Sequence, residues 1–306
     1  MEKVAVVMST YNGEKYICEQ INSILNQTSI VPYIFIRDDG STDNTPGIVS
    51  EYEKKYSNVF FVNNDDRENI GIKNSYLQLL RCALQFDDNI NFFAFSDQDD
   101  VWLPEKLINA IEMLNSTQDD KSALFFSNKT FVDERLNAFY EEKQNFRDDF
   151  FALFYNSGAS GCTMVFNRCL AELAVKIIPQ YTELHDQWLF RIAHCVGADF
   201  YFGNQSYILY RQHGNNVCGI EACKTDRHNW EGLFQKKTHK LQKGLNEILF
   251  HYANELSPVG KKYLKLVENY NTCFKAKIEL AFAPEANYRG LKKHFFWFIT
   301  LMRETI

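Results

Sequence analysis

A regular alternation of short apolar segments with helix-like segments constrains the fold of this chain most. Apolar runs rich in β-branched or aromatic residues predict strands over residues 3–9, 33–37, 59–62, 92–96 and 123–127. Apolar residues at helical spacing predict helices between them, over residues 72–86, over 104–115, and after the first strand at Ile17, Ile21, Ile24 and Leu25. Strands that alternate with helices are typical of a doubly wound α/β sheet.

Turn-forming polar residues follow the first two predicted strands. The segment "TYNGE" (10–14) follows the first, and "DDGSTDNTP" (38–46) follows the second. In the second segment we expect Asp43 or Thr45 to cap a helix that has Pro46 in its first turn. Ligands of doubly wound sheets bind beyond the carboxyl ends of the strands. These segments therefore indicate the edge of the sheet at which a ligand site is expected.

The predicted strand 92–96 leads directly into a concentration of acids. Asp97, Asp99 and Asp100 lie within four positions, and Trp102 closes the segment. Like charges this close cost folding free energy unless a cation or a ligand compensates them. Mg²⁺ and Mn²⁺ prefer oxygen ligands, and Mg²⁺ usually keeps substrate phosphates among its ligands. The pattern therefore predicts that Asp97 and Asp99 direct their carboxylates at one divalent ion.

The last quarter of the chain differs from the rest. Residues 239–256 and 261–282 have helical patterns with no strand signal between them, so we expect a boundary near residue 225. Residues 1–223 hold 18 Lys and Arg against 31 Asp and Glu, whereas the remainder holds 15 against 8. Near the end, residues 295–302 are largely apolar and have basic neighbours, which fits an interfacial helix or a packed terminal helix.

Composition excludes several classes of protein. The acidic first three quarters would repel a phosphate backbone, so nucleic acid is not an expected partner. No apolar run reaches the roughly 20 residues of a membrane helix. The eight cysteines form no C-x-x-C pair, which argues against a zinc site or a thioredoxin-type motif. With no secretory signal at the start, we expect a reduced, cytoplasmic protein.

Six motifs, in a fixed order, carry a resemblance to a known family. They are "STYNGE" (9–14), "RDDGSTDNT" (37–45), "NIGIKNS" (69–75), "SDQDDVW" (96–102), "HDQW" (185–188) and "YRQHGNN" (210–216). Together they resemble family 2 glycosyltransferases with the GT-A fold, closest to the bacterial rhamnosyltransferase-like branch. The resemblance spans about residues 3–217. It implies a Rossmann-like, mixed sheet flanked by helices in a domain of residues 1–225. The helical region 226–306 lies outside the resemblance, and we expect it either to contact the membrane peripherally or to pack on the domain.

The resemblance implies a nucleotide site at the ends of the first strands. A carboxylate at Asp38, with Asp39 nearby, suits the N3–H donor of uracil or thymine, and Gly71 permits close approach of the backbone. Asn69 and Asn74 fit helix caps equally well. The full set expected to bind the donor nucleotide is Thr10, Tyr11, Asn12, Glu14, Asp38, Asp39, Asn69, Gly71, Asn74 and Asp97.

The resemblance also assigns the reacting end of the substrate. Asp186 is the expected catalytic base, since an inverting transferase needs one carboxylate to take the proton of the acceptor hydroxyl. Asp99 and Asp97 are the expected metal ligands with His213, and Arg211 is expected beside the diphosphate with His213. The expected acceptor or sugar pocket contains Trp102, Ser160, Gly161, His185 and Trp188.

The resemblance implies an inverting glycosyltransferase that depends on Mn²⁺ or Mg²⁺. The donor would be dTDP-rhamnose or a UDP-hexose, and the acceptor a bacterial surface polysaccharide or a lipid-linked glycan at the inner face of the plasma membrane. Two alternatives remain open. A haloacid-dehalogenase-like phosphatase would use Asp97 as its nucleophile, although its later metal motif is missing. A catalytically inactive GT-A scaffold is disfavoured by the complete set of acids.

Overall fold

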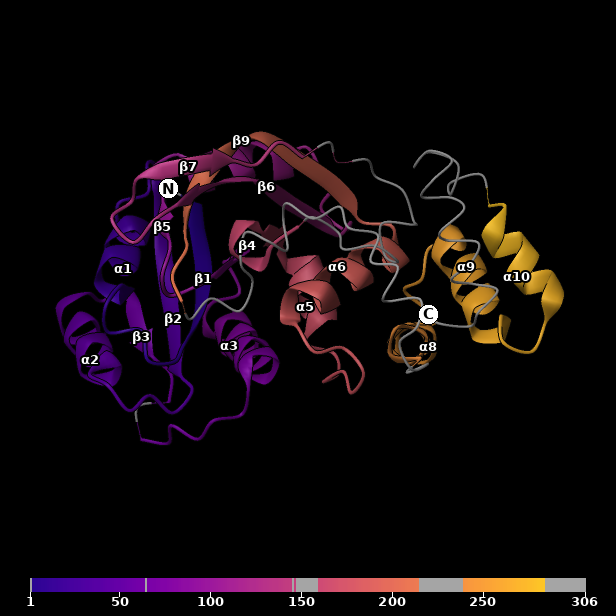
Figure 1. Cartoon of the computed structure of the whole chain (residues 1–306), viewed down its shortest axis with the longest axis horizontal. Coiled ribbons are helices and arrows are strands. Elements are labelled where there is room, and N and C mark those ends of the chain that lie inside the picture. The colour runs from indigo at the N-terminus through magenta and orange to yellow at the C-terminus, as the bar shows by residue number, and fades with distance from the viewer. Residues whose placement is uncertain (1, 64, 145, 147–158, 215–238, 284–306) are drawn as a thin grey trace.

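The computed structural model describes residues 2–63, 65–144, 146, 159–214 and 239–283, which form a nine-stranded sheet flanked by helices (Figure 1). The strand order is β3-β2-β1-β4-β8-β6-β9-β5, with β7 paired to β6. One half of the sheet is parallel and consists of β1 (Glu2–Thr10), β2 (Ile30–Asp38), β3 (Val59–Phe61) and β4 (Phe92–Ser96). These strands confirm four predicted segments.

The other half of the sheet is mixed. Antiparallel pairs join β4 to β8, β8 to β6, β6 to β7 and β5 to β9, whereas β6 and β9 run parallel. Figure 1 shows β6, β7 and β9 arching over the top of the molecule. The strands are β5 (Val101–Trp102), β6 (Ala123–Val132), β7 (Ala138–Glu141), β8 (Val165–Asn167) and β9 (Asp199–Arg211). The predicted strand 123–127 is therefore the first half of a longer one.

Helices cover both faces of the sheet because side chains alternate along its strands. Val4 and Val6 of β1 pack with one set of helices, α1 (Ile17–Leu25), α2 (Thr45–Lys55) and α4 (Lys106–Leu114). Ala5 and Val7 face the other set, α3 (Ile72–Phe86), α5 (Arg168–Ala174) and α6 (His185–Val196). The predicted helix 72–86 is confirmed at both ends.

The predicted cap of α2 is confirmed in part. The helix begins at Thr45 with Pro46 in its first turn, and Asn44, which precedes it, makes no side-chain cap. The Asp43 carboxylate instead accepts a hydrogen bond from the Thr45 backbone N–H at 3.0 Å. Asp43 thus accepts from a backbone N–H of the first helical turn, although it lies one residue before Asn44, the usual capping position.

Three helices extend the molecule beyond the sheet: α8 (Lys240–His251), α9 (Pro258–Asn269) and α10 (Phe274–Ala281), at the orange to yellow end of Figure 1. Their buried side chains belong to the same apolar core as those of α6. Ser257 caps α9 and donates to the Cys195 carbonyl at 3.1 Å, which fixes α9 against the end of α6. The predicted boundary near residue 225 and the apolar segment 295–302 lie outside the described residues.

Candidate active site at the ends of β1, β2 and β4

Asp38, at the end of β2, makes its hydrogen bonds mainly within the turn that follows the strand. Its carboxylate accepts hydrogen bonds from the Ser41 hydroxyl at 2.5 Å and from the backbone N–H groups of Gly40 and Ser41 at 3.2 and 2.9 Å. Thr10, paired with Asp38 in the parallel register, adds a fourth contact at 3.3 Å. Because Asp38 is fully buried, this carboxylate shapes the turn rather than presenting itself to a nucleobase.

Asp39 organises the next segment of the expected nucleotide site. It pairs with buried Arg37 at 2.5 Å and accepts the backbone N–H groups of Ile70 and Gly71 at 2.9 and 3.1 Å. Gly71 has a φ of 80°, and a methyl group added there would meet no atom within 4 Å. The backbone at Gly71 therefore borders open space, as expected for a nucleotide-facing segment, and Asp39 holds it there.

The remaining residues expected at the nucleotide have mixed environments. Tyr11 is 52% exposed, and its backbone N–H and carbonyl are both held by the Gln98 side chain, at 2.9 and 3.0 Å. Gln98 was not predicted from the sequence, although it lies between Asp97 and Asp99. Four others make local contacts with neighbouring loops or helix turns: Asn12, Glu14, Asn69 and Asn74.

A cavity of about 510 Å³ lies beside this region, next to the loop that follows β3. It contains none of the acids that follow β4. Its lining combines Arg37 with several carboxylates and consists of Arg37, Phe61, Val62, Asn63, Asp65, Asp66, Glu68, Ile70 and Gln78.

The acids after β4 lie in three different environments. Asp100 is fully buried, and its pKa is raised well above the usual range by burial and then by the charges of Asp99 and Asp97. Burial, followed by the charges of Asp99 and Asp186, raises the pKa of Asp97 to about 6. Asp99 keeps a side-chain exposure of 16%. The pKa of Asp97 thus depends on Asp186, the expected base, as well as on its neighbours in the acidic loop.

Two buried lysines face these acids. Lys106 is fully buried and donates to the Cys162 carbonyl at 2.6 Å, while its ammonium lies 3.2 Å from the centre of the Trp102 ring. Lys129 donates to the Ser160 hydroxyl at 2.5 Å, and its charge lowers the pKa of Asp97 and Asp100. The protein itself therefore supplies part of the positive charge that the crowded acids require. Neither lysine was predicted.

His213 and Arg211, at the end of β9, lie against the acidic loop in different ways. The Nε2 atom of His213 lies 2.7 Å from Oδ2 of Asp99, within hydrogen-bonding distance, so the two expected metal ligands are in contact. Arg211 is buried; its guanidinium bonds Glu19 and the carbonyls of Asp99 and Glu134. Since these partners bind all three nitrogens of its guanidinium and the side chain is buried, the geometry makes Arg211 a support for the loop rather than a clamp for a diphosphate.

Asp186 lies in the first turn of α6, where the short 3-10 helix η2 (Gly161–Thr163) meets it. Its Oδ2 atom accepts the Gly161 backbone N–H at 3.1 Å, and its Oδ1 atom accepts that of Gln187 at 2.7 Å. A methyl group on Gly161 would lie 2.9 Å from Nε2 of His185. Glycine is therefore required for this close approach, which brings Gly161 of the expected acceptor pocket into contact with Asp186, the expected base.

The two tryptophans expected in the pocket are core residues in this structure. Trp188 has no exposed surface, and its Nε1–H donates to the Ala174 carbonyl at 3.0 Å. Trp102 is 2% exposed and is covered by Lys106. Both rings are therefore part of the core that supports the site, since neither has a face that a sugar can reach.

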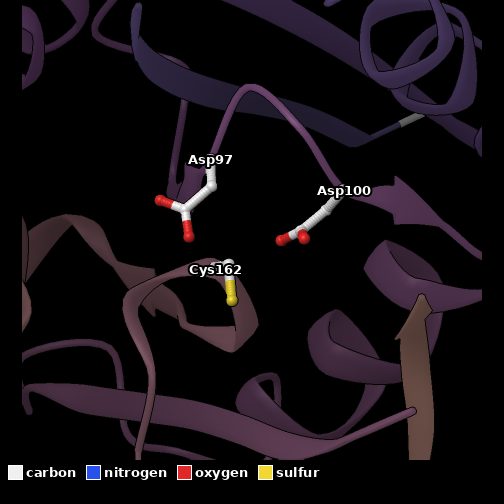
Figure 2. Close-up of side chains that lie close together, drawn as sticks. All are labelled: Asp97, Asp100 and Cys162. Atoms are coloured by element: carbon white, nitrogen blue, oxygen red, sulfur yellow. The ribbon is translucent and has the colours of Figure 1, made fainter. Parts of the chain in front are cut away.

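Two groupings of side chains are candidates for a divalent cation. Ligand atoms of Asp97, Asp100 and Cys162 lie within 4.8 Å of one another, and Figure 2 shows both carboxylates descending from the loop toward Cys162. Burial raises the pKa of the Cys162 thiol well above its usual range, and a thiol suits softer metals. The second grouping is the pair Asp99 and His213, whose Oδ2 and Nε2 atoms lie 2.7 Å apart. With Asp97 this set would suit Mg²⁺ or Mn²⁺ better, because it is mainly oxygen and partly exposed, although the ligand atoms of the three residues do not all lie within 4.8 Å of one another.

Comparisons with known proteins agree with this geometry. A family model described as glycosyl transferase family 2 matches residues 5–172. The dTDP-rhamnosyl transferase RfbG of Shigella flexneri is 30% identical over 84% of this chain and 89% of its own length. An uncharacterized glycosyltransferase of Rickettsia prowazekii, RP339, is 25% identical over 86% of this chain and 81% of its own length.

Solved structures of a GT-A enzyme have the same fold. TarS of S. aureus, residues 1–349, aligns with a TM-score of 0.57 at 18% identity, covering 98% of this chain and 81% of that one. A second structure of the same protein holds UDP-GlcNAc, with a TM-score of 0.57 at 17% identity and the same coverage. The predicted GT-A architecture, a mixed sheet flanked by helices with a helical extension, is confirmed.

Proposed function

The chain belongs to glycosyl transferase family 2, and we propose that it is an inverting transferase that moves a sugar from a nucleoside diphosphate to a glycan acceptor. The observation that carries this proposal is the chain of contacts that joins the neighbour of Asp186 to the acidic loop. His185, which directly precedes Asp186, stacks on Tyr76, and the Tyr76 hydroxyl lies 3.2 Å from Oδ1 of Asp97. The candidate base and the candidate diphosphate-binding loop thus belong to one region of the fold.

The first step assigned to the chain is proton transfer to Asp186. Two backbone N–H groups, those of Gly161 and Gln187, hold its carboxylate and leave further lone pairs for an acceptor hydroxyl. As that hydroxyl oxygen bonds to the anomeric carbon, its proton passes to Asp186. The bond from the anomeric carbon to the diphosphate breaks, and the nucleoside diphosphate leaves with the electron pair. Attack opposite the leaving group inverts the anomeric centre.

Asp99, Asp97 and His213 would hold the divalent cation. Bound there, Mg²⁺ or Mn²⁺ supplies positive charge to the departing diphosphate. Imidazole is a softer ligand than carboxylate, which favours Mn²⁺ over Mg²⁺. Arg211 acts earlier, since its bonds to the carbonyls of Asp99 and Glu134 fix the loop before any ligand binds.

We assign dTDP-rhamnose as the first donor to test, because the similar Shigella flexneri protein is a dTDP-rhamnosyl transferase. A UDP-hexose is the second candidate, since the motifs are shared with enzymes of either donor. The acceptor is a growing bacterial surface polysaccharide or a lipid-linked glycan. Among the described helices, none combines the length and the hydropathy needed to cross a bilayer. We propose peripheral contact with the inner face of the membrane through the basic C-terminal region, because its Lys and Arg side chains would attract anionic lipid.

Turnover assays separate the proposal from its alternatives. The full chain is incubated with dTDP-rhamnose, with UDP-hexoses and with a simple phosphomonoester, each with Mn²⁺. Release of dTDP or UDP from a sugar nucleotide supports a glycosyltransferase. Release of phosphate from the monoester alone supports a phosphatase that uses Asp97, a reading that the family match disfavours. Turnover of none of these compounds supports an inactive scaffold.

A further inference from the structure

Two stacked rings lie between the acidic loop and the base. The His185 imidazole packs face to face on the Tyr76 ring of α3, with centres 3.6 Å apart and planes 11° apart. The edge of the Phe95 ring meets His185 at 4.6 Å. His185 precedes Asp186 directly, and Tyr76 is fully enclosed by the core. The stack therefore joins the first turn of α6 to a helix on which neither acid lies.

The far end of the stack reaches the acidic loop. The Tyr76 hydroxyl donates to the Ser96 carbonyl at 2.7 Å, and Oδ1 of Asp97 lies 3.2 Å from the same hydroxyl as a second acceptor. The near end is closed by Gly161, where an added methyl group would lie 2.9 Å from Nε2 of His185 and whose backbone N–H donates to Asp186. A continuous line of contacts thus runs from Asp97 through two rings to Asp186.

The imidazole contributes its flat face rather than its nitrogens. Both ring nitrogens of His185 are buried and have no hydrogen-bond partner among the described residues. Burial also lowers the pKa of His185 to about 4, so the ring is neutral.

We propose that Tyr76 and His185 form a positioning pair, in which ring stacking sets Asp186 relative to Asp97. This inference rests on the proposed function, because it assigns how the base is placed against the diphosphate-binding loop. A shift of about 1 Å in the base costs about 100-fold in turnover, since the reacting atoms must be aligned. Binding of the nucleotide, which Asp186 does not contact in this account, depends little on the stack.

The test compares flat and non-flat replacements of His185 in the full chain. His185→Leu removes the stacking face, and we expect kcat to fall about 100-fold while the Kd for the nucleoside diphosphate with Mn²⁺ changes less than about threefold. His185→Phe keeps a flat ring without nitrogens and should retain most of the turnover. His194→Leu is the matched control, because His194 stacks on Phe200 at 4.2 Å near the far end of the same helix. It should lower the thermal unfolding temperature without lowering kcat.

A double variant tests the pairing itself. The double variant Tyr76→Leu/His185→Leu is compared with the two single variants. Its kcat should be little lower than that of the less active single variant, because either change alone already breaks the stack. If the fold-loss in kcat of the double variant equals the product of the two single fold-losses, the residues act independently and the proposal is overturned. Wild-type turnover in His185→Leu would also overturn it, as would an equal loss in a folded His185→Phe, which would assign the role to the imidazole nitrogens. A wild-type protein that turns over no sugar nucleotide would overturn the proposed function as well. This outcome is seen in the wild-type assay, before any variant is measured, so it is distinguished from a failure of the positioning pair alone.

Discussion

The Nε2 atom of His213 lies 2.7 Å from Oδ2 of Asp99, so the last residues described after β9 meet the loop that follows β4. His213 is held in place by Tyr16, whose ring stacks on it with centres 5.1 Å apart. A carboxylate and an imidazole in contact, both partly exposed, are suited to share one divalent ion.

Replacement of His213 by alanine should therefore weaken the response to the cation. We expect the Mn²⁺ concentration for half-maximal turnover to rise about 10- to 100-fold, as for the loss of one metal-site residue. Manganese titrations of the rate measure this directly. His251→Ala, at an exposed position on α8, serves as the control and should leave the titration unchanged. An unchanged titration in His213→Ala would remove His213 from the cation site.

Asp186→Asn should separate binding from chemistry. The amide keeps the shape of the side chain but cannot accept a proton, so transfer should fall about 10²- to 10⁴-fold. Nucleotide affinity should stay near that of the wild type. Asp88→Asn, an exposed carboxylate outside the site, is the matched control. Wild-type turnover in Asp186→Asn would mean that another group is the base.

Gly161→Ala should affect the same step by geometry alone. The added methyl would lie 2.9 Å from Nε2 of His185 and 3.2 Å from Cβ of Asp186, so the first turn of α6 must shift. We expect kcat to fall about 10- to 100-fold with little change in the Kd of the nucleotide. At Gly214 an added methyl meets no atom within 4 Å, and Gly214→Ala should keep wild-type kinetics. Equal kinetics in the two variants would contradict the contact.

His185 should make the protein less stable in mild acid. Its pKa is about 4 when folded against an ordinary value of 6.5, so below about pH 6.5 protonation favours the unfolded chain, and this loss levels off near pH 4. Between about pH 7 and pH 5, the wild type should lose about 2 kcal/mol more unfolding free energy than His185→Phe. Urea unfolding at the two pH values gives both quantities. If the wild type and His185→Phe lose the same unfolding free energy between the two pH values, the pKa of His185 is not lowered by folding.

Deletion of residues 288–306 tests the proposed membrane contact. Cationic and aromatic side chains near the end of the chain would bind an anionic, headgroup-level surface. The truncated chain should leave the membrane fraction while its Kd for nucleotide stays unchanged. A truncated chain that still sediments with membranes would assign the contact to another surface.

Local patterns predicted the elements of this fold well. The segments 72–86 and 92–96 become α3 and β4 with the predicted bounds, because their apolar spacing matches the face they bury. The strands β5, β7 and β9 were not predicted. β5 has two residues, and its pairing with β9 joins segments that are distant in the sequence, whereas β7 is a short, mostly exposed strand with little apolar pattern.

The residues of the site were predictable only where a motif fixed their role. Asp99 and His213 meet as expected, yet Arg211 and Trp188 turn inward, and burial of this kind is decided by tertiary packing. The lysines at 106 and 129 gave no signal in the sequence, since an isolated lysine is normally exposed. Their burial becomes understandable only beside the acids that they face.

Binding of a sugar nucleotide through a divalent cation held by Asp97, Asp99 and His213 underlies every step proposed for this chain. Calorimetric titration of the full chain with dTDP-rhamnose and UDP-hexoses, with Mn²⁺ and then with a chelator, measures that binding. We expect saturable binding of at least one donor with Mn²⁺, and its loss with the chelator. A folded protein that binds none of these donors, or binds one equally well in the chelator, would refute the proposed cation site.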